Sequence, residues 1–353
     1  MTFLTLATAM LMAALSLPLV GGAPLHVHND GQAAPLEIEG AAVSAIAIDP
    51  ARGEAHYAVA GSTLYRADGS GSWKPSGTDP GRDILVVDSR EPATIWAGSG
   101  IDCYRGMETP QPLLMSSDAG ATWTETVVDG FVPLASWAGT GVVLAHDCSG
   151  LHVSRDNGVT WSAPAELPLG SQITAFAVSA SPESAEGLSI LVGVTGEGGT
   201  SELYRLRLSD PDAIVVDGPL QTYYGFGAVT VDDLGAILLA APQGVLSSAD
   251  RGETWEVDRT GLESTTLPED PIESFPTDSD PGSFGLSAIV TVGDVTYVSG
   301  VDGIYARSAQ EQGWQHIASL NAEIVSLATL PGSGDLLAQL SSGEVLTVHA
   351  PGG

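Results

Sequence analysis

The chain has only two cysteines, Cys103 and Cys148, and they are the first side chains to consider for chemistry. Two thiols are too few ligands for a metal site. In an exported chain a single pair favours a disulfide, so we expect Cys103 to be bonded to Cys148. The candidate binding residues that such a bridge would hold on one face are Tyr104, Arg105, His146 and Asp147.

A second candidate group lies near the N-terminus, where His26 and His28 are one residue apart and Asp30 follows. On a strand face these residues could hold a metal. The other interpretation is a terminal tail in which the histidines share no role. We favour the tail and therefore predict no metal site.

The longest acidic stretch is Leu262–Ser283, which has six carboxylates, four prolines and neither lysine nor arginine. This composition excludes a regular strand. Three roles stay open for it, namely a lid, a calcium-binding loop or a solvated insert. Glu269 and Asp270 are its candidate binding residues. We predict no cofactor, with calcium at this stretch as the one alternative.

The motifs of several enzyme classes are missing from the sequence. It contains no G-x-S-x-G of serine hydrolases, no H-E-x-x-H of zinc proteases and no glycine-rich phosphate loop. Carboxylates are so abundant that a pair suited to glycoside hydrolysis cannot be picked out by residue type.

The elements that would position these side chains are built around one motif, S-x-D-x-G-x-T-W. The Asp can accept hydrogen bonds from backbone N–H groups of its own turn, and the Gly provides a positive φ. The Thr begins the next strand, and the Trp buries a large ring beside it. We expect a structural hairpin turn at each copy. The copies are Ser116–Trp123, Ser154–Trp161 and Ser248–Trp255, with Asp118, Gly120, Trp123, Asp156, Gly158, Trp161, Asp250, Gly252 and Trp255 as the structural residues.

Short apolar runs separated by turn residues recur along the whole chain and predict an all-β protein. They group into seven units with a spacing of roughly 48 residues, within the range of four-stranded propeller repeats. Asp68–Trp73 reads as a degenerate copy of the motif in the first unit. The last unit has only three strands, so we predict that Leu36–Glu39 completes it and closes a ring.

Charge and the N-terminal segment limit where the protein can act. The net charge of −31 repels phosphate backbones and anionic lipids, which excludes nucleic acid as a partner and favours basic partners or divalent cations.

Residues 1–23 are predicted to be a secretory signal peptide, with an uncleaved membrane anchor as the alternative. A linker over 24–35, one domain over 36–349 and a tail over 350–353 follow. We expect export to the periplasm, the cell surface or the medium.

The three motif copies resemble the Asp-boxes, or BNR repeats, of sialidase-like β-propellers. The resemblance implies a seven-bladed β-propeller with Asp-box hairpin turns, closed by an N-terminal strand. It also implies that a ligand would bind on the face opposite the boxes, where connections between blades and between second and third strands lie.

The sequence departs from the catalytic pattern of that family. Its Arg-Ile-Pro motif does not occur, and no Tyr–Glu nucleophile pair can be assigned. The arginines that we place on the ligand face, Arg82, Arg105 and Arg259, come in a different order and context. In size, repeat type and export signal the chain is also similar to single-propeller assembly factors such as those of photosystem II, but it lacks their basic patch.

The ligand face is expected to carry Gly98–Pro112, the acidic stretch and an aromatic group formed by Tyr223, Tyr224 and Phe226. The aromatic rings would either stack on a sugar or peptide or fill the axis, and both interpretations stay open. We predict a monomeric, non-catalytic binding or scaffold protein with a protein or glycan ligand on this face. The alternative is a glycoside hydrolase, sialidase-like or glucan-active, that uses the same face.

Overall fold

The computed structural model describes residues 33–349 except for 50–52, 88–92, 101–109, 138–140, 164–171, 180–187, 196–199, 211–212, 225, 233, 263–284, 310, 312, 321 and 334. Every regular element in these residues is a β-strand, so the chain is all-β as predicted. Within the described ranges no helix is long and apolar enough to cross a membrane.

The strands form successive antiparallel groups in which most strands pair with the next strand along the chain. In the first half of the chain they are β1 (Ala33–Pro35), β2 (Glu37–Ile38), β3 (Ala41–Asp49), β4 (Glu54–Ala60), β5 (Thr63–Ala67), β6 (Trp73–Thr78), β7 (Ile84–Val87), β8 (Ile95–Gly98), β9 (Pro112–Ser116), β10 (Thr124–Asp129), β11 (Val132–Trp137), β12 (Val142–Asp147) and β13 (Gly150–Ser154). In the second half they are β14 (Gln172–Ser179), β15 (Leu188–Thr195), β16 (Thr200–Asp210), β17 (Ala213–Tyr224), β18 (Ala228–Val231), β19 (Ile237–Ala241), β20 (Gly244–Ser248), β21 (Glu256–Asp258), β22 (Ile289–Val292), β23 (Val295–Gly300), β24 (Gly303–Ser308), β25 (Gln315–Ser319), β26 (Ile324–Thr329), β27 (Leu336–Leu340) and β28 (Val345–Val348).

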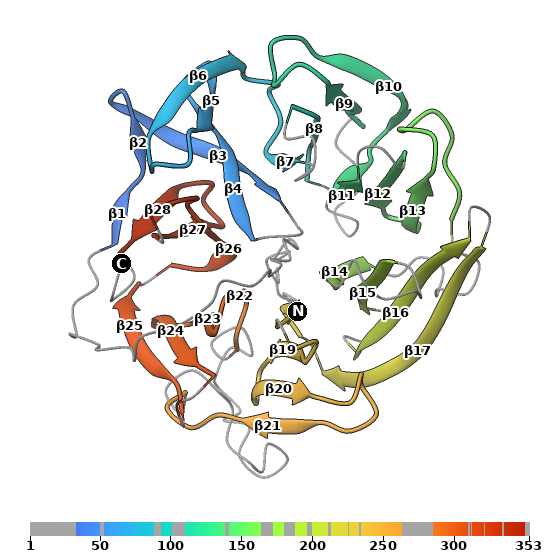
Figure 1. Ribbon diagram of the computed structural model, residues 1–353, viewed down its shortest axis with the longest axis vertical. Coiled ribbons are helices and arrows are strands. Elements are labelled where there is room, and N and C mark those ends of the chain that lie inside the picture. Colours follow the sequence, from blue (N-terminus) through green and yellow to red (C-terminus); the bar gives the residue numbers. More distant parts are fainter. Residues whose placement is uncertain are drawn as a thin grey trace, which may run out of the picture.

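Figure 1 shows the groups arranged as a ring around a central axis, with the last strand of each group on the rim. The groups β3–β6, β7–β10, β14–β17, β18–β21 and β22–β25 each contain four strands. In the group β11–β13, only the bridge between Val153 and Ser162 continues the sheet among the described residues. Neighbouring inner strands also touch, since Ala47 of β3 pairs in parallel with Leu85 of β7.

The ring closes through the N-terminal strand β1, which pairs antiparallel with β28. The ladder runs from Ala33 opposite Val348 to Pro35 opposite Leu346. Because the first strand joins the last group, the two ends of the ring hold each other and neither leaves an unpaired edge.

The position of the closing strand differs from the sequence prediction. Leu36–Glu39 was expected to close the ring, but β1 is Ala33–Pro35, in the stretch assigned to the linker. Glu37 and Ile38 instead fold back on β3 through a turn in which Glu39 and Gly40 both have positive φ. An Ala-Ala-Pro strand has little β propensity, so only its pairing with β28 reveals it.

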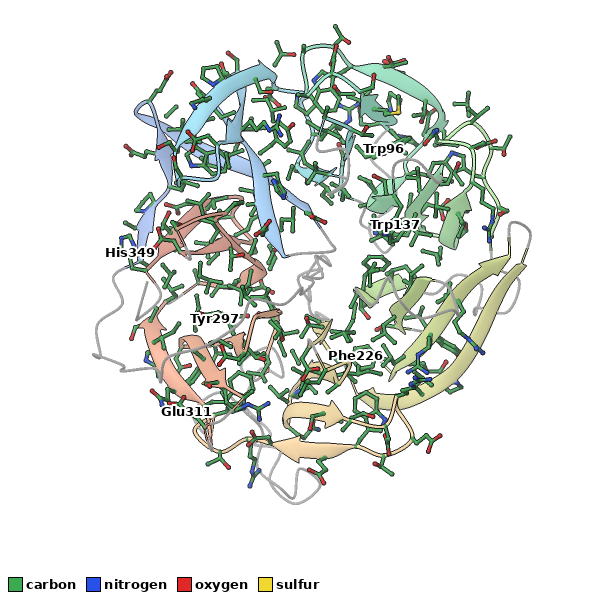
Figure 2. The ribbon with its side chains drawn as sticks, viewed as in Figure 1. Trp96, Trp137, Phe226, Tyr297, Glu311 and His349 are labelled. Carbon is green, nitrogen blue, oxygen red and sulfur yellow. The ribbon has the colours of Figure 1, made fainter. Side chains whose placement is uncertain are left out.

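The core lies between neighbouring sheets. The inner strands β7, β11 and β18 are buried along their whole length. Such strands, covered on both faces, are apolar runs without alternation. Trp96 of β8 packs with Val143 of β12 in the layer between two groups, and Trp137 packs in the next layer (Figure 2).

The three S-x-D-x-G-x-T-W turns are closed networks of hydrogen bonds. In the turn after β13, Oδ1 of Asp156 accepts from Thr160 N (2.8 Å) and Ser154 Oγ (2.9 Å), while Oδ2 accepts from Thr160 Oγ1 (2.6 Å). Ser154 Oγ also accepts from Gly158 N at 2.8 Å. The turns of Asp118 and Asp250 repeat this pattern.

Two of the three turns also donate a hydrogen bond to the preceding group. Nε1 of Trp123 donates to Thr78 O of β6 at 3.1 Å, and Nε1 of Trp255 donates to Leu220 O of β17 at 3.3 Å. A Cβ on Gly158 would lie 2.6 Å from the ring of Trp96. The glycine of the motif is therefore required for close approach between groups as well as for its positive φ.

Candidate functional site

The antiparallel order of the strands divides the connections between two faces. We call the end that carries the β8–β9, β10–β11, β12–β13 and β21–β22 connections the loop face, and the opposite end the turn face. Backbone bonds place the motif turns on the turn face: Ala119 N donates to Ala93 O beside the β7–β8 turn, and Asn157 N to Gly141 O in the β11–β12 turn.

Several predicted site residues lie outside the described residues. They are Cys103, Tyr104, Arg105, Glu269 and Asp270, together with His26, His28, Asp30 and the expected signal peptide. Cys148 is described and lies in the β12–β13 turn on the loop face. Because Cys103 lies outside the described residues, the pairing of the two cysteines stays a prediction.

The backbone of Tyr223 and Tyr224 lies at the rim of the ring. Tyr223 and Tyr224 are the last residues of the rim strand β17, opposite Ser201 and Thr200 of β16, and do not open an inner strand. Gly218 and Pro219 lie within β17. The strand continues past these residues with a shift in register.

Phe226 is a core residue and not a binding residue. Its side chain is only 3% exposed and packs beside β18 (Figure 2). A Cβ on Gly193 of β15 would lie 2.4 Å from the Phe226 ring, so the ring occupies the space that this glycine leaves. Of the two interpretations left open for this ring, its burial favours a packing role.

Arg82 and Asp83 hold the two ends of the segment 101–109. Arg82 donates from Nη2 to Pro112 O at 3.2 Å, just after this segment. Oδ1 of Asp83 accepts from Gly100 N at 3.1 Å, just before it. Arg82 thus bonds to the backbone beside this segment on the loop face.

The segment 263–284 also emerges from a rigid base. Leu262 is fully buried, and the preceding Thr260 accepts from Trp314 N at 2.7 Å. Arg307 binds the Asp258 carboxylate and lies 4.7 Å from the centroid of the Trp314 ring. On the far side of the segment, Ser287 Oγ donates to Ile324 O at 2.7 Å. The residues before the segment 263–284 are therefore bonded at the rim, and those after it are bonded at the start of the inner strand β22.

His146 and Asp147 end strand β12 on the loop face. His146 is 4% exposed, and its Nδ1 has no partner among the described residues. Burial lowers its pKa to about 4, against a smaller opposing effect of Asp147. The buried imidazole is therefore neutral at physiological pH.

Asp147 belongs to a polar cluster that also contains Ser149 and His152, which the sequence analysis missed. Its Oδ1 accepts from Ser149 N (2.7 Å), Ser149 Oγ (2.6 Å) and His152 Nε2 (2.8 Å). Burial raises the pKa of Asp147, but the bonds from His152 and Ser149 outweigh it and lower the pKa to about 2. The His152 ring stacks on Phe131 with centroids 4.3 Å apart, which fixes the orientation of the imidazole.

This cluster does not have the geometry of a catalytic triad. Ser149 Oγ lies 3.2 Å from His152 Nε2, the same nitrogen that contacts Asp147. In a serine hydrolase the nucleophile and the carboxylate use opposite ring nitrogens. Among the residues that the structure describes, no group of three or more His, Cys, Asp or Glu side chains could hold a metal.

Only part of the Asp147 cluster could have been predicted from the sequence. Asp followed two residues later by Ser is a local turn pattern, and Ser149 could have been read from it. His152 could not, because its contact with Asp147 depends on the pairing of β12 with β13, in which Ala145 lies opposite His152.

Comparison with known proteins identifies the fold. No family model and no curated protein matches the sequence. The extracellular domain of BT4673 from B. thetaiotaomicron has a TM-score of 0.57 and 12% identity, over 91% of this chain and 40% of that longer chain. The RRP9 WD40 repeats give 0.54 and 13% identity, over 90% of this chain and 97% of that one. The Dos1 propeller gives 0.50 and 9%, over 88% and 78%. This chain is therefore a β-propeller.

Proposed function

We propose that the chain is an exported, seven-bladed propeller of the Asp-box type that acts as a non-catalytic binding or scaffold protein through its loop face. The seven successive strand groups, with β1 completing the group β26–β28, support the blade count. The bonding of Asp118, Asp156 and Asp250 supports the Asp-box type. The apolar segment Met1–Val20 and the likeness to an extracellular domain support export.

We place the binding surface on the loop face because the two faces differ. On the turn face, both oxygens of each motif carboxylate are occupied by donors of their own turn. On the loop face, Arg82 and Asp83 bond to the backbone on either side of one long connection, and Asp258 ends the strand that precedes the other. Long connections on a rigid scaffold are where binding residues concentrate.

The partner that fits this face is a basic segment of another protein. The chain carries 43 acidic and 12 basic residues, and the 263–284 connection adds acidic side chains with no lysine or arginine. Such a field attracts cationic groups and repels anionic sugars such as sialic acid. The remaining alternatives, a glycan ligand and hydrolysis of a glycan, become outcomes of the test.

The Cys103–Cys148 disulfide is the covalent part of this proposal. Bridging would tie the segment 101–109 to the β12–β13 turn and so hold the loop face together. Mass spectrometry of the exported, non-reduced protein should find the two cysteine peptides linked. Two free thiols in that sample would rule the bridge out.

Replacing 263–284 by a short Gly-Ser turn tests the proposed face. The fold should be retained, because loop length changes closure entropy only slowly. A partner captured from an extracytoplasmic extract should bind the shortened protein at least tenfold more weakly, by about 1.4 kcal/mol.

The matched control changes the turn face. Leu234 is 92% exposed in the β18–β19 turn, so Leu234→Ser should leave the affinity unchanged. Equal affinity of the wild type and the shortened protein, or loss of binding in Leu234→Ser, would contradict the assignment. If the protein releases sugar products from a glycan array, the glycoside hydrolase alternative would take the place of the binding role.

A further inference from the structure

Asn157 lies exposed in the turn after β13 and is the only asparagine of the chain that a glycine follows. An asparagine in this position can react with its own backbone. The nitrogen of Gly158 gives up its proton and bonds to Cγ of Asn157, and the side-chain nitrogen leaves as ammonia. Water then opens the resulting cyclic imide to aspartate or isoaspartate. Glycine favours this attack because it has no Cβ to obstruct the approach, and the reaction needs water but no cofactor.

The backbone of the closed turn is not arranged for this reaction. Asn157 has a φ of 57°, in the left-handed region. Closing the imide ring requires rotation about the bond between Cα and the carbonyl carbon of Asn157, away from this conformation. Two hydrogen bonds resist that rotation. Asn157 N donates to Gly141 O at 2.9 Å, and the attacking atom, Gly158 N, donates to Ser154 Oγ at 2.8 Å.

Packing against the preceding group adds a second barrier. Gly158 is buried, and a Cβ on it would lie 2.6 Å from the ring of Trp96, so its backbone already lies close to that ring. Trp96 is itself 1% exposed and has little room to yield. The Gly158 nitrogen can therefore reach Cγ of Asn157 only after the turn has opened. A reaction of this kind proceeds at a rate set by the population of the open form.

We propose that Asn157 is a modification site, protected while the turn of residues 154–161 is closed and deamidated to aspartate or isoaspartate when that turn opens. The other two motif turns have Ala119 and Arg251 at this position, with φ of 60° and 64°, and neither side chain can react in this way. Either product places a negative charge beside Asp156, and isoaspartate also lengthens the main chain by one atom. The site therefore records, irreversibly, that one joint between two groups has opened.

The test compares the full mature protein with a synthetic peptide of residues 154–161 in mildly alkaline buffer, and peptide mapping by mass spectrometry follows both products. Asn157 should deamidate at least about tenfold more slowly in the folded protein than in the peptide. Hydrogen exchange at the Gly158 amide should be slowed by a similar factor, because it also requires the turn to open. Equal deamidation in protein and peptide would overturn the proposal, and so would a Gly158 amide that exchanges as fast as in the peptide.

Ser154→Ala removes the acceptor of Gly158 N and should accelerate deamidation of Asn157 at least about fivefold. The matched control is Ser116→Ala, which removes the equivalent acceptor of Gly120 N in another motif turn and should keep the wild-type rate at Asn157. Equal acceleration in both variants would show that global unfolding exposes the site and would reject protection by this turn. An unchanged rate in folded Ser154→Ala would reject it as well. If Ser154→Ala does not fold, the exchange of the wild-type Gly158 amide decides the question alone.

Discussion

At the scale of single residues, the carboxylates of the three motif turns accept hydrogen bonds from donors of their own turns. Asp156 and Asp250 have pKa values of about 2, mainly because the neighbouring Thr side chains and backbone N–H groups donate to them. His146 shows the opposite case, a titratable group that burial keeps neutral. Both kinds of shift make stability depend on pH.

Asp156→Ala should lower the melting temperature by about 2–6 °C, because the turn loses the acceptor for Thr160 N and Thr160 Oγ1. The lowered pKa means that this stabilisation is present above about pH 4 and disappears as pH falls toward 2. The difference between wild type and variant in thermal unfolding should therefore shrink over that range. Val159→Ala, in the same turn and 64% exposed, is the control and should change little.

His146 should make the protein less stable on mild acidification. The unfolded chain accepts the proton near pH 6.5, whereas the folded chain excludes it until about pH 4. The free energy of unfolding should thus be highest above pH 6.5 and fall as pH decreases, by about 1.4 kcal/mol per pH unit within this window. Denaturant unfolding of wild type and His146→Leu at pH 7 and pH 5 measures this. The same pH response in both proteins would show that His146 is not the cause.

At the scale of elements, the joints between sheets are made by turns and by the chain ends. The motif turns carry hydrogen bonds to the preceding sheet, and β1 carries the bond between the first and last strands of the ring. The backbone N–H of Leu36 extends that ladder to Val345 O at 2.8 Å. A short N-terminal strand therefore contributes to closing the ring, together with the bond from Thr329 N to Gly53 O at 2.7 Å.

Two truncations measure the contribution of β1. Removal of residues 1–36 leaves β28 without its outer partner and should lower the melting temperature by well over about 5 °C. Removal of 1–32 retains β1 and should leave the melting temperature near that of the mature protein. If the two truncated proteins melt together, the closure by β1 does not stabilise the ring.

At the scale of the whole molecule, the dominant feature is a net charge of −31 on one compact ring (Figure 1). Like charges on a folded surface repel one another and destabilise the compact state. The same field accelerates the approach of a basic partner. Charge therefore favours association at the cost of stability.

Raising NaCl from about 0.05 M to 0.5 M shortens the Debye length from roughly 14 Å to 4 Å and should screen this repulsion. The melting temperature should rise with salt, while the affinity for a basic partner should fall. Calorimetry and a binding titration in the same buffers check both directions. A melting temperature that falls with salt would show that attractive ion pairs outweigh the repulsion.

The sequence by itself determined the features whose partners are close along the chain. The turn of Asp156 could be predicted because its hydrogen bonds join Ser154 to Thr160, all within one motif. The all-β class could be predicted because short apolar runs between turn residues depend only on local pattern.

Only the tertiary structure decided the features that depend on register and on packing between sheets. Ala33–Pro35 is a strand because β28 lies beside it, and Phe226 is buried because Gly193 leaves room for its ring. Asp147 meets His152 because β12 and β13 pair in one register. Such contacts join residues through backbone ladders and side-chain volume, and neither quantity is encoded by residue type at a single position.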